Sequence, residues 1–338
     1  MRAHINVSRA GLPALLVAVT LVLASCGAAG SAGGHEGADH GSGQGGKQAS
    51  DNEKMDHGNA EAGNMQDEDH DSSGSEEHSG MAMGPAVAPE EADLEIETRM
   101  IPESPAPGRP VELSYRVSDA GSGEPITELP VDHERQMHLI AVSRDLEEFQ
   151  HIHPESGPGG DFAVTAEFPE AGTYVLYDEF KRGEQTVVDR RELDVGGGGG
   201  EASLSPDTEP KTVGGLTVSL EAPDEIRAGQ EATFIYTVEK EGGSPADDLE
   251  PYLGAAAHVA LVSEDTREFA HTHGEDVNGG SGEVSESGGH EHGGGGQTFG
   301  PKISFTHTFE EDGAYKVWAQ FNHHGHVVTV PFVVEVVR

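Results

Sequence analysis

The sequence has few basic residues, few aromatic residues and a single cysteine. It contains 20 Lys and Arg against 61 Asp and Glu, for a formal net charge of −41, and only 34% of its 338 residues are hydrophobic. A chain this acidic does not hold nucleic acid by bulk charge, so we expect no nucleic-acid partner. One cysteine excludes an intrachain disulfide framework and a cysteine-ligated zinc or iron–sulfur site. Because globular domains are richer in apolar residues, we expect part of the chain to be unfolded.

Residues 1–25 have the features of a signal peptide. Arg2 and Arg9 precede an apolar stretch that is too short for a secure membrane span. The stretch ends in Leu23-Ala24-Ser25-Cys26, which resembles a bacterial lipobox. This resemblance implies cleavage before Cys26 and a lipid on its sulfur, which would anchor the protein to the extracytoplasmic face of the cell membrane. The alternative is an ordinary secretory signal followed by an incidental cysteine.

Residues 26–90 contain no aromatic residue and are rich in Gly, Ser, His and acidic residues. Such a segment buries too little apolar surface to offset the entropy of ordering, so we expect a disordered tether. Met55-Asp56-His57 and Met81-Ala82-Met83 resemble motifs of extracytoplasmic copper-handling proteins. Imidazole and thioether groups suit copper, which favours weak metal scavenging by the tether. The alternative is a spacer whose His and Met residues have no such role.

The rest of the chain contains two copies of one unit. MHLIAVSRDLEEFQHIH, residues 137–153, aligns with AHVALVSEDTREFAHTH, residues 257–273. Further along, FPEAGTYVLYDEF aligns with FEEDGAYKVWAQF. We expect repeat 1 over residues 91–195, a Gly-rich linker over 196–212 and repeat 2 over 213–338, with a disordered insert at about 274–298.

Short runs of alternating or apolar residues separated by Gly, Pro, Asp and Ser predict strands throughout both copies. About seven strands in about 100 residues are typical of an immunoglobulin-like sandwich. We therefore expect an all-β protein of two tandem immunoglobulin-like antiparallel β-sandwich domains after the tether. In each Gly-x-Tyr turn, the Tyr is expected to pack and bond back to the backbone. The expected core residues are Leu139, Val142, Phe149, Phe168, Leu176 and Phe180, and in repeat 2 Val259, Val262, Phe269, Phe309, Val317, Trp318 and Phe321.

The spacing of the histidines predicts that they meet. If residues 137–143 and 148–153 form a hairpin, His138 lies opposite His153 in one register and opposite His151 in the other. His151 and His153 project from one face of their strand, and opposed Cβ atoms lie about 5 Å apart. The three rings can then converge on a metal ion. Repeat 2 carries the same pattern. The candidate ligands are His138, His151 and His153, and His258, His271 and His273.

Repeat 2 has a second histidine cluster, at the turn between its last two strands. One of its members can complete a four-ligand set with the histidines of that repeat, whereas repeat 1 has Lys181-Arg182-Gly183 at the equivalent turn. Histidines in strands are also commonly packed or hydrogen-bonded, so a structural network remains the alternative. Asp145 and Asp265 are interpreted as turn residues. The additional candidate ligands are His323, His324 and His326.

A His-x-His strand and a Gly-x-Tyr strand behind a lipoprotein signal resemble secreted bacterial proteins with YtkA-like or related immunoglobulin-like domains. In some of these proteins the pattern runs PYLG…H…F-x-H-x-H, which Pro251 to Gly254 and His258 to His273 carry here, while repeat 1 departs from it at Pro130-Val131. The resemblance implies a secreted location, an immunoglobulin-like fold and an association with heavy metals.

Three functions follow from these patterns. The leading hypothesis is a non-enzymatic, membrane-anchored lipoprotein that buffers or delivers copper or zinc. The second is a metal-free structural or adhesive module on the cell surface. The third is catalytic, because residues 149–153 resemble the His-x-His strand of copper–zinc superoxide dismutases, although that family's disulfide is absent. The sequence identifies no protein partner.

Overall fold

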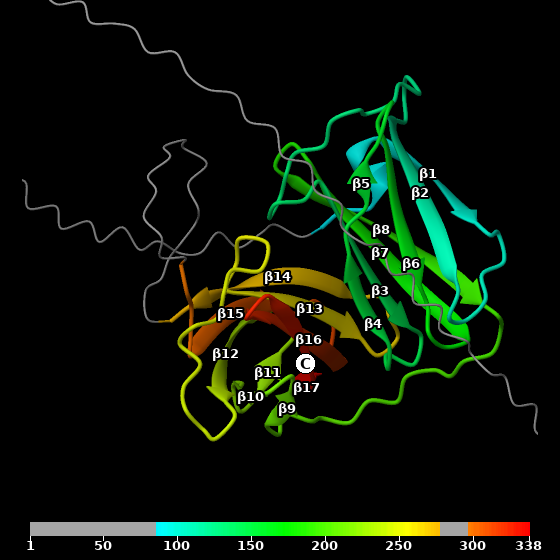
Figure 1. Ribbon diagram of the computed structural model, residues 1–338. Helices are drawn as coiled ribbons and strands as arrows, with labels where there is room; N and C mark the ends of the chain where they lie inside the picture. The colour runs from blue at the N-terminus through cyan, green and yellow to red at the C-terminus, as the bar shows by residue number, and fades with distance from the viewer. Residues whose placement is uncertain (1–85, 278–296) are drawn as a thin grey trace, which may run out of the picture. The chain divides into compact units, whose positions relative to one another are not determined.

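The computed structural model describes residues 86–277 and 297–338 (Figure 1). The predicted signal peptide, Cys26, most of the predicted tether and most of the predicted insert lie outside the described residues. The described chain is built of β-strands and one 3-10 turn, η1 (Pro89–Ala92). The described residues belong to one compact unit, which contains both repeats. In this described part of the chain, no helix is long and apolar enough to cross a membrane.

Repeat 1 is an antiparallel β-sandwich of two four-stranded sheets. One sheet has the order β1-β2-β6-β5 and the other the order β4-β3-β7-β8. The strands are β1 (Leu94–Ile101), β2 (Pro110–Asp119), β3 (Met137–Ser143), β4 (Phe149–Ile152), β5 (Glu155–Ser156), β6 (Asp161–Glu167), β7 (Gly172–Arg182) and β8 (Gln185–Val195).

In repeat 2, the nine strands of the described residues are joined into one sheet of order β11-β17-β16-β13-β14-β15-β12-β10-β9. The sheet is continuous because the end of β14 pairs with β15, Glu275 opposite Ser304. Residues 274–276 of the predicted insert therefore belong to a strand. The strands are β9 (Lys211–Val213), β10 (Leu216–Glu221), β11 (Ile226–Arg227), β12 (Glu231–Lys240), β13 (Ala257–Ser263), β14 (Phe269–Asp276), β15 (Lys302–Thr308), β16 (Gly313–His323) and β17 (His326–Val337).

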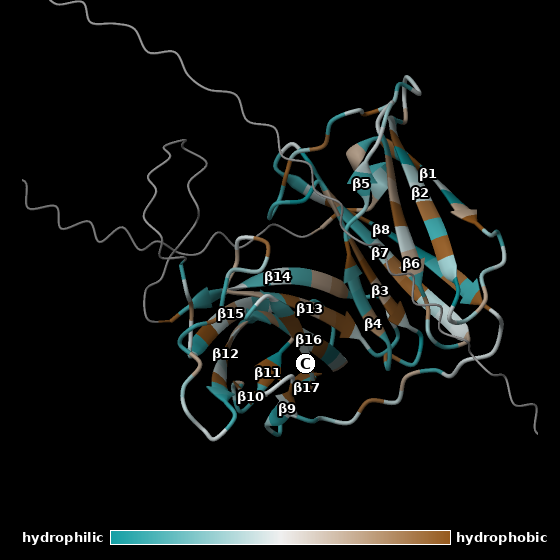
Figure 2. Ribbon diagram, in the orientation of Figure 1, coloured by the Kyte–Doolittle hydropathy of each residue, from teal (hydrophilic) through white to brown (hydrophobic). Residues whose placement is uncertain are grey.

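The predicted all-β fold of two tandem immunoglobulin-like sandwiches is confirmed. Hydrophobic and polar residues alternate along strands such as β2, and its buried and exposed positions alternate in step (Figure 2). Both Gly-x-Tyr tyrosines bond back to the backbone as predicted. Tyr174 Oη donates to the Glu170 carbonyl at 3.3 Å, and Tyr315 Oη to the Glu311 carbonyl at 3.0 Å.

The predicted core residues divide between two environments. Leu139 packs inside the repeat 1 sandwich, but Val142 and Phe149 belong to a separate apolar cluster that also contains Val262 and Trp318 of repeat 2. Residues three apart in a strand point to opposite faces of the sheet, so Leu139 and Val142 cannot share one core. Every residue of β3 and of β13 is nonetheless buried, because each repeat covers the outer face of the other.

The contact between the repeats is built twice from equivalent residues. Phe149 stacks on Trp318 with ring centroids 4.9 Å apart, and the aligned pair, Phe269 and Tyr177, stacks at 4.3 Å. The turn of each hairpin also reaches the other repeat. Tyr177 Oη donates to the Thr266 carbonyl at 2.8 Å, and Lys316 Nζ donates to the Leu146 carbonyl at 2.6 Å.

The predicted linker is held against this contact. Ala202 and Leu204 pack on the apolar cluster between the repeats. The Ala202 amide donates to the Arg144 carbonyl of repeat 1 at 3.2 Å, and the Leu204 amide donates to the Glu264 carboxylate of repeat 2 at 2.6 Å. The connection between the sandwiches is therefore bonded to both of them.

Candidate metal centre

The two histidine hairpins form in the same register. In repeat 1, Leu139 lies opposite Ile152 and Ile140 opposite His151, which places His138 level with His153. In repeat 2, His258 pairs directly with His273. The first of the two predicted registers is thus present in both copies, and the three histidines of each copy lie at one end of its hairpin.

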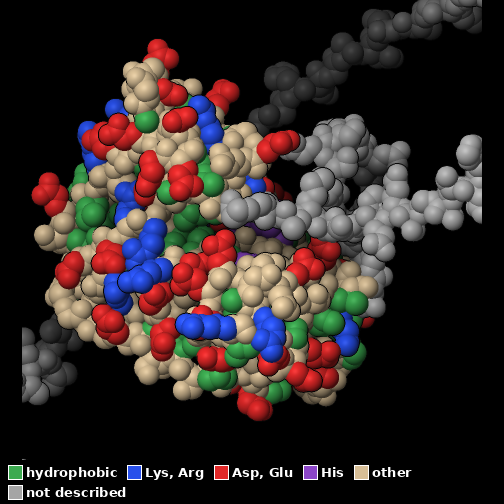
Figure 3. All heavy atoms as spheres, turned by 180° about the vertical axis from the view of Figure 1, so that it is seen from behind, with side chains coloured by type: hydrophobic (Ala, Val, Ile, Leu, Met, Phe, Trp, Pro, Cys, Tyr) green, Lys and Arg blue, Asp and Glu red, His purple; other side chains and the backbone are tan. Residues whose placement is uncertain are grey.

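The histidines of the two repeats meet between the sandwiches. Sequence reasoning placed one group of three within each repeat, but the structure groups them across the repeats. The physical reason is that the hairpin histidines lie on outer sheet faces that the packing of the repeats brings together. Within each group, one ring nitrogen of each histidine lies within 4.8 Å of those of the other two. Figure 3 shows histidine side chains deep in a recess of the surface. The first group is His138, His151 and His271, and the second is His133, His258 and His273.

Hydrogen bonds determine which nitrogens of the first group carry lone pairs. His138 Nε2 lies 3.0 Å from the Asp132 carbonyl oxygen, which only accepts, so the neutral ring is protonated at Nε2 and not at Nδ1. His151 Nδ1 donates to Gln320 Oε1 at 2.7 Å, which leaves its Nε2 unprotonated. His138 Nδ1 and His151 Nε2 are 3.1 Å apart. Two lone pairs therefore face each other, and a cation between them would stabilise this arrangement.

The ring separations of the first group match those of imidazoles around one ion. Metal–nitrogen bonds of about 2.0 Å at tetrahedral angles place ligating nitrogens about 3.3 Å apart and ring centroids about 5 Å apart. The observed centroid separations are 5.4 Å for His138 and His151, 5.2 Å for His138 and His271, and 4.8 Å for His151 and His271. The first group can therefore receive an ion with little rearrangement.

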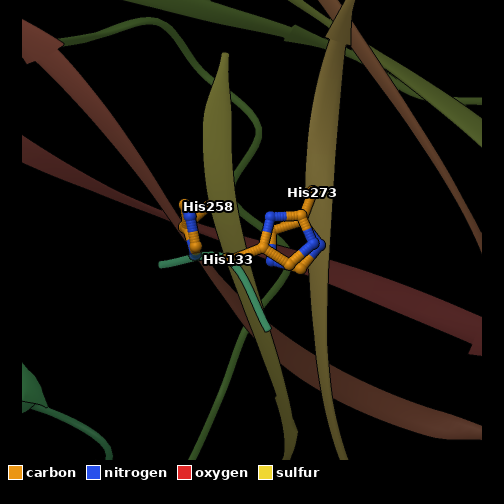
Figure 4. A group of neighbouring side chains, drawn as sticks. All are labelled: His133, His258 and His273. Atoms are coloured by element: carbon orange, nitrogen blue, oxygen red, sulfur yellow. The ribbon is translucent and has the colours of Figure 1, made fainter. Parts of the chain in front are cut away.

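The second group is arranged differently (Figure 4). His133 and His273 stack face to face with centroids 3.3 Å apart, which is too close for two rings that share an ion. The ring of His258 lies across His273 at 4.5 Å. Among the described residues, His258 Nε2 and His273 Nε2 are buried and have no hydrogen-bond partner. This group offers free nitrogens, but its rings would have to separate to bind an ion together.

Sequence reasoning missed His133. It precedes β3 and aligns with Leu253 of repeat 2, so the comparison of the two copies has no counterpart for it. Both residues adopt a left-handed conformation, with φ of 47° and 48°, which shows that the turn is shared although the side chain is not. The only available signal was a further histidine close to the hairpin.

Burial keeps the clustered imidazoles neutral. It lowers the pKa of His138 and holds the pKa values of His151 and His271 well below the ordinary value. Burial lowers the pKa of His153 to about 2. Neutral imidazole is the form that binds metal, so these rings need not lose a proton to become ligands.

The carboxylate of Glu179 lies against the first group. Glu179 Oε1 lies 3.1 Å from His271 Nδ1, the position that Gln320 holds against His151 on the other side. Burial raises the pKa of Glu179 to about 7. Acceptors on the far nitrogen fix the ring orientation and tautomer of ligating histidines, and both acceptors come from the opposite repeat.

The predicted ligands of the last turn form a separate group. His323 and His324 lie near Asp248, with His323 Nε2 3.5 Å from Asp248 Oδ1. His326 pairs with His323 across the hairpin and is exposed. The structure therefore groups this turn with an aspartate rather than with His258.

Asp145 and Asp265 occupy the hairpin turns, as predicted. Asp145 accepts from the hydroxyl of Ser143 at 2.6 Å, and Asp265 from that of Ser263 at 2.8 Å. These bonds, with those to the backbone amides two residues further on, stabilise the tight turn that enters the other repeat.

Fold and site thus define a tandem immunoglobulin-like protein with a histidine cluster between its repeats. The chain belongs to the family described as a domain of unknown function, DUF8832, which matches residues 91–196 and again residues 211–338. No curated protein matches it. The predicted resemblance to YtkA-like domains stays a prediction.

Among solved structures, the chain is similar to the Escherichia coli adhesin FdeC, with 12% identity over 73% of this chain and 64% of that one and a TM-score of 0.24. It is similar to the Yersinia pseudotuberculosis adhesin InvE, with 10% identity over 72% and 60% and a TM-score of 0.24. A two-domain fibronectin type-III segment of chicken tenascin gives 11% identity over 71% and 97% and a TM-score of 0.21. The chain spans less than two thirds of the length of both adhesins.

Proposed function

We propose that this protein binds a transition-metal ion, zinc or copper, through imidazoles gathered between its repeats, and that it buffers or delivers the ion rather than catalysing a reaction. The observation that carries the proposal is the meeting of His138, His151 and His271 with their nitrogens within 4.8 Å. Nitrogen-only sites of this kind suit both ions.

The chemistry of the first group supports this function. His138 Nδ1 and His151 Nε2 present lone pairs 3.1 Å apart, close to the separation of two ligands on one ion. The rings are held from behind by Asp132 and Gln320, so little side-chain entropy remains to be lost on binding.

The test is a chelator-competition titration of the purified chain with Zn(II) and Cu(II). We expect the wild type to withdraw metal from a chromophoric chelator and His151→Ala/His271→Ala to lose this tight site. His307→Gln, which removes an imidazole outside all three groups, serves as the matched control and should compete like the wild type. Near-UV circular dichroism from Trp318 shows whether each variant has kept its packing. Equal competition by wild type and double variant would contradict the proposal.

A metal-free structural role is the second candidate. His258 Nδ1 and His271 Nε2 are 3.0 Å apart, a distance that also fits a hydrogen bond between neutral rings. Such bonds, together with the aromatic stacking, would hold the repeats together without an ion. Melting temperatures that are identical in chelator and in excess zinc would favour this role, because a ligand at 100 times its Kd adds about 2.7 kcal/mol to stability.

The proposed location is the extracytoplasmic face of the cell membrane, through a lipid on Cys26. The support is the lipobox-like Leu23-Ala24-Ser25-Cys26 after an apolar stretch. We expect Cys26→Ser to move the protein from the membrane fraction to the soluble fraction without changing its metal binding. Unchanged membrane association would contradict a lipid anchor.

A further inference from the structure

We infer that His258 is the fourth ligand of this ion, so that two histidines from each repeat hold one ion and the ion links the repeats. This inference rests on the metal binding proposed above and adds the ligand set and the position of the ion. It also replaces the expectation of one ion in each repeat.

The interface has an approximate two-fold axis. Phe149 on Trp318 and Phe269 on Tyr177 are the same contact with the repeats exchanged. An interface in which residue i meets residue j and the equivalent of j meets the equivalent of i is isologous. When a residue of one repeat contacts the equivalent residue of the other repeat, the two residues lie on opposite sides of the two-fold axis and next to it.

His151 and His271 are such a pair. They occupy aligned positions of the two hairpins, and their ring centroids are 4.8 Å apart. Each donates from Nδ1 to the other repeat, His151 to Gln320 at 2.7 Å and His271 toward Glu179 at 3.1 Å. Both Nε2 atoms are therefore directed away from these partners. An ion that binds both rings lies on or near the axis, where the two repeats present the same surroundings.

Symmetry then adds His258 wherever His138 is a ligand. The centroid of His138 lies 5.2 Å from that of His271, and the equivalent separation, His258 to His151, is 5.5 Å. His138 Nδ1 is 3.1 Å from His151 Nε2, and His258 Nδ1 is 3.0 Å from His271 Nε2. The widest separation in the set, His138 to His258, is 6.2 Å, which a shift of about 1 Å brings to the tetrahedral value.

His153 is the competing fourth ligand. Its Nε2 lies 3.2 Å from His151 Nε2. Its equivalent in repeat 2, His273, is stacked against His133, which has no counterpart in repeat 1. A set that includes His153 is therefore not repeated on the other side of the axis, whereas the set of His138, His151, His258 and His271 is.

The first test counts ions in half-set variants. We expect one tight zinc per wild-type chain. We expect none in His138→Ala/His151→Ala or in His258→Ala/His271→Ala, because each variant keeps only the two ligands of its unchanged repeat. His307→Gln should keep the single ion. Two ions in the wild type and one in each variant would overturn the inference while leaving the proposed function intact. A wild-type chain that binds neither zinc nor copper tightly would overturn both.

The second test needs no variant and decides the matter if the variants fail to fold. Long-range ¹H–¹⁵N spectra of the chain with and without zinc show which ring nitrogens bind the metal. We expect shifts of bound type at Nδ1 of His138 and His258 and at Nε2 of His151 and His271. Such shifts at His153 with none at His258 would overturn the inference.

Discussion

The two repeats have equivalent histidine hairpins but differ in the residues that surround these hairpins and in part of the sandwich interior. Inside the repeat 1 sandwich, Asp178 is fully buried with its Oδ2 3.2 Å from Arg191 Nε, and the aligned positions of repeat 2 are Ala319 and Phe332. The hairpin histidines and their stacked aromatic partners, by contrast, occur in both copies. The histidines and stacked rings of the contact have kept their chemistry, whereas this buried charged pair occurs in the interior of repeat 1 and not at the aligned positions of repeat 2.

In the metal centre, the equivalent histidines of the two repeats have different neighbours. Glu179 and Gln320 hold equivalent histidines, one with a carboxylate and the other with an amide. His133 has Leu253 as its counterpart. The ligand positions are thus symmetric and their surroundings are not, so exchanging surrounding residues between the repeats separates the two contributions.

The largest expected effect comes from the buried ion pair. Asp178→Ala leaves the Arg191 guanidinium with only the partly exposed Asp189 as an ion-pair partner and should reduce the free energy of unfolding by about 3–5 kcal/mol. Asp178→Ala/Arg191→Phe copies the repeat 2 interior and should regain most of this loss. Urea unfolding of the two variants measures both effects. A double variant no more stable than Asp178→Ala would show that the repeats do not tolerate each other's interiors.

The aromatic stacks are the next comparison. Trp318→Ala and Tyr177→Ala each remove a buried ring from the contact between the repeats. Each should reduce the free energy of unfolding by about 3–5 kcal/mol. Thermal unfolding gives the losses, and the rate of proteolysis within residues 196–200 reports whether the repeats have separated. A large loss from only one of the two substitutions would contradict a symmetric interface.

His307 distinguishes the repeats at acid pH. Burial lowers its pKa to about 4, against an ordinary 6.5, and its equivalent in repeat 1 is Ala166. Between these pH values the unfolded chain binds a proton that the folded chain does not, so this histidine reduces stability as the pH falls. His307→Ala should remove about 3 kcal/mol of the loss between pH 6.5 and 4, measured by urea unfolding at several pH values. If the free energy of unfolding falls with pH by the same amount in wild type and variant, the role of His307 is contradicted.

The smallest expected effect is at the acceptor behind the ligands. Glu179→Gln makes the two sides alike and should weaken zinc binding by about tenfold, because a carboxylate makes its histidine a stronger ligand than an amide does. Gln320→Glu should strengthen binding by a similar factor. Chelator competition measures both, and affinities that change in the same direction would show that these residues act through packing alone.

Local patterns were sufficient for much of the fold. Alternating runs predicted the strands, the matching copies predicted the duplication, and the Gly-x-Tyr turns predicted the bonds of Tyr174 and Tyr315. The spacing of the histidines left two hairpin registers open, and the structure has the one that places His138 level with His153. These features depend on contacts between residues close in sequence or on the period of two of a strand.

Val142 and Phe149 show which part of the packing local patterns do not predict. Val142 and Phe149 are hydrophobic and were assigned to the sandwich interior, but they cover the other repeat. Hydrophobicity records that a residue is buried and does not record which surface buries it. The spacing of the histidines likewise does not record that the two hairpins face each other, so the histidines were divided by repeat. His133 was missed because its counterpart in repeat 2 is Leu253.

By itself, the sequence determined two β-sandwiches, each carrying a histidine hairpin, because strand period, turn chemistry and duplication are written along the chain. Only the tertiary structure decided that outer face packs on outer face, which gathers His138, His151 and His271 into one group. That choice depends on the complementarity of two whole surfaces, whose stacked rings join residues 92 and 169 positions apart, and no local pattern encodes it.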